Sequence, residues 1–168
     1  MDALLRRLAT VFAILGSAVA LATGLMTLAS VVGRAALSAP IPGDVELTQF
    51  GIALAISLGL PWCQLKRANI IVDFFTQRLS PRRLQGLDGI GALLLAAMCL
   101  LLAWRTGVGA LSVKEAGEQS MILSLPMWWA YASLAPGLAL AGVIGLWQGL
   151  RQLAGRPLPD PSGEGAGP

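Results

Sequence analysis

The sequence predicts an all-α membrane protein with four transmembrane helices and a short amphipathic helix at the cytoplasmic interface. Hydrophobic residues make up 55% of the 168 residues and charged residues only 12%, unlike the balance of a soluble domain. The hydrophobic residues gather into four runs, each above the roughly 20 residues that a helix needs to cross a bilayer. Within lipid, a helix satisfies its own backbone hydrogen bonds. The predicted spans are about 8–32, 45–65, 87–111 and 126–150.

The positive charges predict the orientation of these spans. Nine of the 12 basic residues lie before the first span, between the second and third, or after the fourth. Because basic residues favour the cytoplasmic side, both termini are predicted to be cytoplasmic. The tryptophans fall near predicted span ends, where an indole ring suits the membrane interface. They are Trp62, Trp104, Trp128, Trp129 and Trp147.

The composition argues against several classes of function. The pI is near 9.4 but the net charge is only +3, and the basic residues line a membrane face, which favours anionic lipid over nucleic acid. The chain has no histidine, and Cys63 and Cys99 lie at depths too different for a disulfide. It shows no phosphate-binding loop and no dinucleotide fingerprint. We therefore expect no enzyme, cofactor, metal or nucleic acid.

The first span follows a basic pair, and its residues 18–20 resemble the cleavage site of a signal peptide. The apolar run continues well past the roughly 7–15 residues of a signal peptide, so we expect an uncleaved span. Small residues recur every four positions within it, which lets membrane helices approach closely. These residues are Gly16, Ala20 and Gly24.

Proline and glycine residues within 33–44 end the first span. Asp44 and Glu46 then fall at the start of the second span, where an acidic group caps the helix and favours the positive end of its dipole. Capping is one interpretation of both residues. The other is an ion pair with Arg34 or Arg105, or a contact with another subunit.

The segment between the second and third spans predicts the interfacial helix, over about 69–80. Its apolar residues fall on one half of a helical wheel and its polar residues on the other. Ser80 and Pro81 then suit the N-cap and the first turn of the next helix. The segment is either an ordinary interfacial linker or a strut against a partner subunit. Its candidate contact residues are Arg67, Asp73, Phe74 and Phe75.

The third and fourth spans hold few polar groups. Arg105 is the only basic residue well inside a span, and it lies beside Trp104 near the outer end, so we expect its side chain to extend to the interface. A Pro-Gly pair at 136–137 is the one candidate break in the fourth span. Residues 1–155 thus form one membrane domain, and the Pro- and Gly-rich residues 156–168 a disordered cytoplasmic tail.

Short motifs follow one another in a definite order along the chain. They are Arg34, Glu46, Lys66–Asp73, Arg78–Arg83, Gly117, Ser120, Pro126–Trp128, Tyr131 and Pro136–Gly137. The ordered set, on four spans, resembles the small membrane subunit of tripartite ATP-independent periplasmic (TRAP) transporters, the DctQ-like family, over about residues 5–150. One position departs from the family, because Asn69 stands where histidine is usual.

This resemblance implies a subunit of the bacterial inner membrane that pairs with a large multi-span permease and a periplasmic substrate-binding protein. Together such proteins import organic acids, such as C4-dicarboxylates, sialic acid or other carboxylates, driven by an ion gradient that is usually sodium. The large subunit holds substrate and ions, and the small subunit enlarges its scaffold. The lack of mid-membrane coordinating groups agrees with this role. The alternative is a self-sufficient small transporter or channel that acts as a homo-oligomer.

Overall fold

The computed structural model describes residues 2–38, 41–66, 81–156 and 158. This described part consists of four long helices without a β-strand, which confirms the predicted all-α class. Each helix is long and apolar enough to cross a membrane. The helices are α1 (Asp2–Leu37), α2 (Asp44–Leu65), α4 (Pro81–Glu115) and α5 (Trp128–Leu153).

Two predicted features fall outside the described residues. The interfacial helix was expected over 69–80, and its candidate contacts Arg67, Asp73, Phe74 and Phe75 lie in the segment 67–80 that the structure does not describe. Most of the predicted tail also lies outside the described part. Both features therefore stay predictions.

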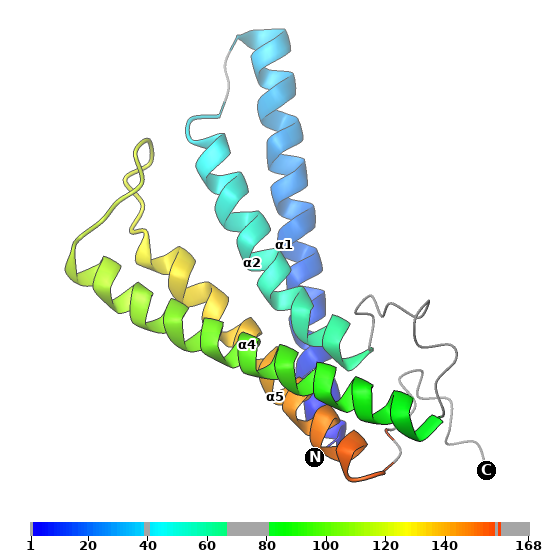
Figure 1. The fold of residues 1–168 in the computed structure, drawn as a ribbon. Coiled ribbons are helices and arrows are strands. Elements are labelled where there is room, and N and C mark those ends of the chain that lie inside the picture. The colour runs from blue at the N-terminus through cyan, green and yellow to red at the C-terminus, as the bar shows by residue number, and fades with distance from the viewer. Residues whose placement is uncertain (1, 39–40, 67–80, 157, 159–168) are drawn as a thin grey trace.

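The helices form two hairpins, α1 with α2 and α4 with α5, and α2 also packs against α5. Figure 1 shows that the hairpins cross near one end of the molecule and diverge toward the other. We call the first the terminal end, because α1 and α4 begin there and α2 and α5 end there. We call the other the loop end, because it carries the connections 38–43 and 116–127.

Glycines of α5 allow its close packing against α4. A Cβ atom at Gly142 would lie 2.7 Å from the side chain of Leu100, and one at Gly149 would lie 2.7 Å from Leu93. At Gly145 the nearest atom would be the carbonyl oxygen of Ala92, at 3.2 Å. Because small residues let helix backbones approach, this spacing of three and four residues sets the α4–α5 contact.

The α1–α2 contact uses a different spacing. A Cβ at Gly16 would lie 3.0 Å from the carbonyl oxygen of Ala55, and the hydroxyls of Thr27 and Thr48 lie 3.0 Å apart. Ala20 and Gly24 are exposed, and a Cβ at Gly24 would meet no atom within 4 Å. Only the first member of the predicted stripe therefore lies in this helix contact.

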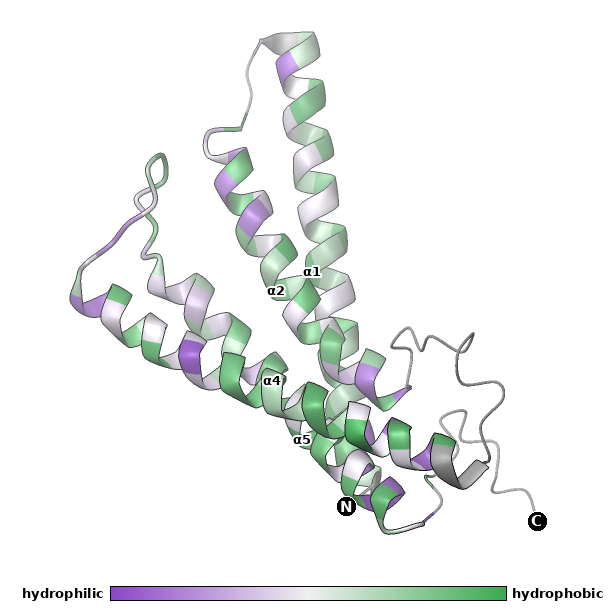
Figure 2. Ribbon diagram, in the orientation of Figure 1, coloured by the Kyte–Doolittle hydropathy of each residue, from purple (hydrophilic) through white to green (hydrophobic). Residues whose placement is uncertain are grey.

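Apolar residues run along all four helices, as the hydropathy colouring in Figure 2 shows, and many of their large side chains are exposed. Only 6% of the most apolar stretch of α1 is buried within the chain, compared with 28% of that of α5. In a soluble protein such exposure would be a liability. Here it indicates contact with lipid or with another membrane subunit.

Candidate functional site

A polar cluster at the loop end fixes the turn between α1 and α2. The Asp44 carboxylate accepts hydrogen bonds from the Ser30 hydroxyl at 2.6 Å and from Arg34 Nη2 at 2.9 Å. Ser30 is fully buried and its hydroxyl oxygen also accepts from the N–H of Ile41 at 3.2 Å. The ion pair of Asp44 with Arg34, one of the alternatives predicted for Asp44, is thus present. Since the Arg34 side chain is 61% exposed, water screens this pair and its contribution to stability is small.

Glu46 joins the two hairpins. Its Oε1 accepts a hydrogen bond from the N–H of Ile122 at 2.8 Å, and its Oε2 accepts one from the N–H of Leu123 at 3.2 Å. Glu46 therefore contacts the α4–α5 loop, whereas Arg34 pairs with Asp44. Bonds from backbone N–H groups to a carboxylate are among the stronger hydrogen bonds in proteins.

The loop 116–127 is shaped to present these two N–H groups. The Ser120 N–H donates to the carbonyl of Leu125 at 2.9 Å. The Leu125 N–H donates in turn to the hydroxyl oxygen of Ser120 at 3.1 Å. The side chain of Leu123 covers Gly43, whose φ of 72° is left-handed. A side chain at Gly43 would be strained and would collide with Leu123. The α2 N-terminus and this loop therefore form one unit.

Replacing Glu46 with alanine should release the loop 116–127 from the N-terminus of α2. The change removes the two carboxylate oxygens that accept hydrogen bonds from the N–H groups of Ile122 and Leu123. We expect faster hydrogen exchange of the amides of residues 120–125, with the cores of α4 and α5 unchanged.

Glu118→Ala is the matched control, because Glu118 is an exposed acid of the same loop. Equal exchange in the two variants would contradict the assignment of Glu46 as the contact between the hairpins.

Two further polar contacts lie between α2 and α5. The Ser57 hydroxyl donates to the carbonyl of Leu134 at 2.7 Å. Nearer the terminal end, Gln64 and Gln148 are each only 4% exposed, and Gln64 Nε2 donates to Gln148 Oε1 at 3.0 Å. These three residues were not among the predicted contact residues. Each is an isolated serine or glutamine within an apolar span. Inside a membrane such a side chain must find a hydrogen-bond partner, and this is the sequence feature that could have indicated them.

No three His, Cys, Asp or Glu side chains of the described residues gather in a way that could hold a metal ion. Ser57, Gln64 and Gln148 bond one another or the backbone of the neighbouring helix. This arrangement holds helices together.

A comparison with known families identifies the family of this chain. The DctQ component of tripartite ATP-independent periplasmic transporters matches residues 23–155. The chain belongs to the DctQ family. It is a multi-pass inner-membrane protein and the small subunit of a TRAP transporter. Neither the search of curated proteins nor that of solved structures gave a match.

Tryptophans mark both ends of this DctQ subunit. Three of them lie 4.9–5.1 Å from a basic side chain placed over the ring, a contact that holds a cation at interface depth. The pairs are Lys66 with Trp62, Arg151 with Trp147 and Lys114 with Trp128. The first two lie at the terminal end and the third at the loop end.

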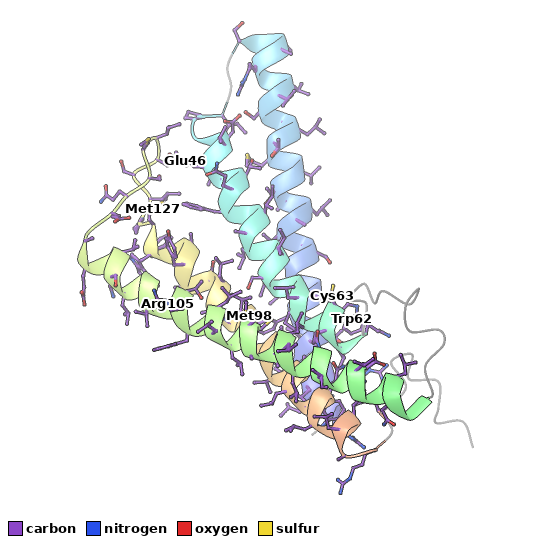
Figure 3. The ribbon with its side chains drawn as sticks, viewed as in Figure 1. Glu46, Trp62, Cys63, Met98, Arg105 and Met127 are labelled. Atoms are coloured by element: carbon purple, nitrogen blue, oxygen red, sulfur yellow. The ribbon has the colours of Figure 1, made fainter. Side chains whose placement is uncertain are left out.

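Arg105 lies on the outer surface of α4, and Figure 3 shows it well apart from Glu46. Ala96 and Leu100, which meet Gly145 and Gly142 of α5, lie on a different side of α4. Arg105 is therefore exposed on the surface of the described helices, and its extension to the interface stays a prediction.

Proposed function

We propose that this DctQ subunit is the scaffold subunit of an ion-gradient-driven, binding-protein-dependent importer of organic acids. It packs against a large permease subunit, which carries substrate and ions. One observation carries the proposal: the buried polar side chains Ser57, Gln64 and Gln148 are bonded to neighbouring helices, while the outer faces of the helices are apolar. A carboxylate or sodium ion at mid-membrane needs convergent polar groups. Among the described residues, Ser57, Gln64 and Gln148 are instead engaged in contacts between α2 and α5.

The exposed small residues of α1 and the arginine of α4 are the proposed contacts with the large subunit. Ala20 and Gly24 leave room for close approach of another helix. Arg105 offers a charge that is expensive to leave in lipid and favourable to pair with a partner carboxylate. The homo-oligomeric alternative has no structural observation of its own in its favour.

Co-purification and uptake test this role. In mild detergent, the chain should bring down a large permease. Reconstituted alone, it should show no sodium-dependent uptake of organic acids, whereas uptake should appear with the permease and a loaded binding protein. Uptake by the lone chain would replace the scaffold role with that of a small transporter.

We further propose that the terminal end is cytoplasmic and the loop end periplasmic. The terminal end carries Arg6, Arg7, Lys66, Arg151 and Arg156 among its described residues, which supports this orientation by the positive-inside rule. The loop end would then face the binding protein. There, Met121 is 99% exposed at the tip of the 116–127 loop.

Cysteine labelling tests the orientation. The native Cys63 and Cys99 are first removed. A single cysteine then replaces Ser38, Ser80, Ser120 or Ser162, one position in each variant. An impermeant thiol reagent added to intact cells should label positions 38 and 120 only, and all four positions after permeabilisation. Labelling of 80 or 162 in intact cells would reject the orientation.

A further inference from the structure

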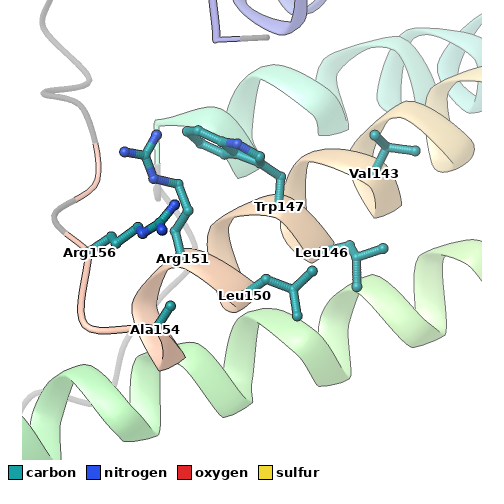
Figure 4. Close-up of a pocket in the computed structure, with 7 residues that line it drawn as sticks. All are labelled: Val143, Leu146, Trp147, Leu150, Arg151, Ala154 and Arg156. Atoms are coloured by element: carbon teal, nitrogen blue, oxygen red, sulfur yellow. The ribbon is translucent and has the colours of Figure 1, made fainter.

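A groove of about 310 Å³ runs along the outer side of α5 at the terminal end (Figure 4). Its apolar part is formed by Val143, Leu146 and Leu150, which recur at helical spacing on one face of α5. Its polar end is formed by Arg151 and Arg156. From Val143 to Arg151 the helix rises roughly 12 Å, close to half of the roughly 30 Å hydrocarbon core.

The end of α5 places the two arginines together. Gly155 takes a left-handed conformation, with φ of 68°. The Arg156 N–H then donates to the carbonyl of Arg151 at 3.0 Å, and the Gly155 N–H to that of Gln152 at 3.0 Å. This pair of bonds is the Schellman motif, which turns the chain back over the end of a helix. Figure 4 shows the Arg156 side chain extending toward Arg151.

Trp147 sets the position of the first arginine. The indole packs against the buried cluster of Leu5, Ala9 and Ile144. The Arg151 guanidinium lies over the same ring, 5.1 Å from its centroid. A ring that is held by packing on α1 and α5 thus fixes a cation at the mouth of the groove.

We propose that this groove binds one anionic phospholipid, with its phosphate at Arg151 and Arg156 and an acyl chain along Val143, Leu146 and Leu150. Guanidinium groups match phosphate geometry through paired N–H donors. The polar end of the groove thus offers two guanidinium groups directly beside its apolar part. A free phosphate would leave the apolar part unused. The inference requires membrane insertion only and is independent of the proposed partner subunits.

Native mass spectrometry of the full chain, with whatever subunits co-purify, tests this site. Phosphatidylglycerol is titrated against phosphatidylcholine with the same acyl chains. We expect one phosphatidylglycerol bound at least tenfold more tightly than phosphatidylcholine. The R151Q/R156Q variant should lower its affinity to the phosphatidylcholine level. R6Q/R7Q loses the same charge at the same end of the molecule and should retain the preference.

A second pair of variants tests the turn without changing charge. Asparagine tolerates the left-handed conformation and valine does not. Gly155→Asn should therefore keep the lipid preference and Gly155→Val should weaken it several-fold. A Cβ at this position meets no atom within 4 Å, so neither variant disturbs packing.

Four results would overturn the proposal. They are equal binding of the two lipids, an equal loss in R6Q/R7Q, displacement of the lipid by inorganic phosphate at equal concentration, or cross-linking of a cysteine at Leu146 to a co-purified subunit. The last result would make the groove a protein interface.

Discussion

Gly137→Val should separate α2 from α5 and leave little folded protein in the membrane. A Cβ at Gly137 would overlap the backbone carbonyl of Ser57 on α2. Backbone cannot rotate aside as a side chain can, so the helices must move apart. The hydroxyl of Ser57 would then lose its bond to Leu134. We expect a loss of about 3 kcal/mol, in the upper part of the range for overpacked cores.

The close approach at Gly137 has a cause in both helices. Pro61 lies inside α2 and has no N–H, so the carbonyl of Ser57, four residues earlier, lacks its usual helical partner. That carbonyl lies against Gly137, where the absence of a side chain gives it room. A proline in one helix and a glycine in the other therefore form one contact.

Gly91→Val is the matched control for this variant. Gly91 lies in α4, and a Cβ there would meet no atom within 4 Å. Its unfolding in mixed detergent micelles, followed by tryptophan fluorescence, should resemble that of the unmodified chain. Equal destabilisation by the two variants would show that valine disturbs the helices themselves and that the Ser57–Gly137 contact is unimportant.

The apolar runs predicted the existence and order of the helices, but not all of their bounds. α1 covers Asp2–Leu37 and α4 covers Pro81–Glu115, both longer than the predicted 8–32 and 87–111. Hydropathy marks only the part of a helix that lies in hydrocarbon, whereas backbone hydrogen bonds continue the helix into the interface until a turn residue ends it.

Helix pairing was harder to predict, because every face of such helices is apolar. Within the chain α1 meets α2 at Gly16, Thr23 and Thr27, so the four-residue stripe does not describe this contact, and a contact of Gly24 with another subunit stays a prediction. Seven residues separate Gly16 from Thr23, which is close to two full turns at 3.6 residues per turn. A step of eight residues rotates Gly24 roughly 80° away from Gly16. In α5, by contrast, Gly142, Gly145 and Gly149 all lie against α4.

The polar contacts were predictable only in part. Arg34 and Asp44 are close in sequence and of opposite charge, so their ion pair could be proposed. The partners of Glu46 are backbone N–H groups of a distant loop, and backbone carries no signal in a sequence. A glutamine in an apolar span predicts that a hydrogen bond exists, but it does not identify the partner.

Gln148→Leu should destabilise the α2–α5 contact by about 3 kcal/mol, because it leaves several buried groups unsatisfied at once. Gln148 Nε2 donates to the carbonyls of Gln64 and Leu65, at 3.1 and 3.3 Å. These are last-turn carbonyls of α2, which the helix itself cannot satisfy. Gln148 Oε1 also accepts from the Gln64 amide. One side chain thus caps α2 and holds it to α5.

Gln152→Leu is the control, one turn further along the same helix. Its Oε1 is buried without a hydrogen-bond partner in the described structure, so removing that atom should leave stability unchanged or raise it. Both variants replace glutamine with leucine in α5, and unfolding in mixed micelles measures both. Opposite directions are expected. A similar effect of the two changes would mean that Gln148 contributes only its volume, and that α2 is held by apolar packing alone.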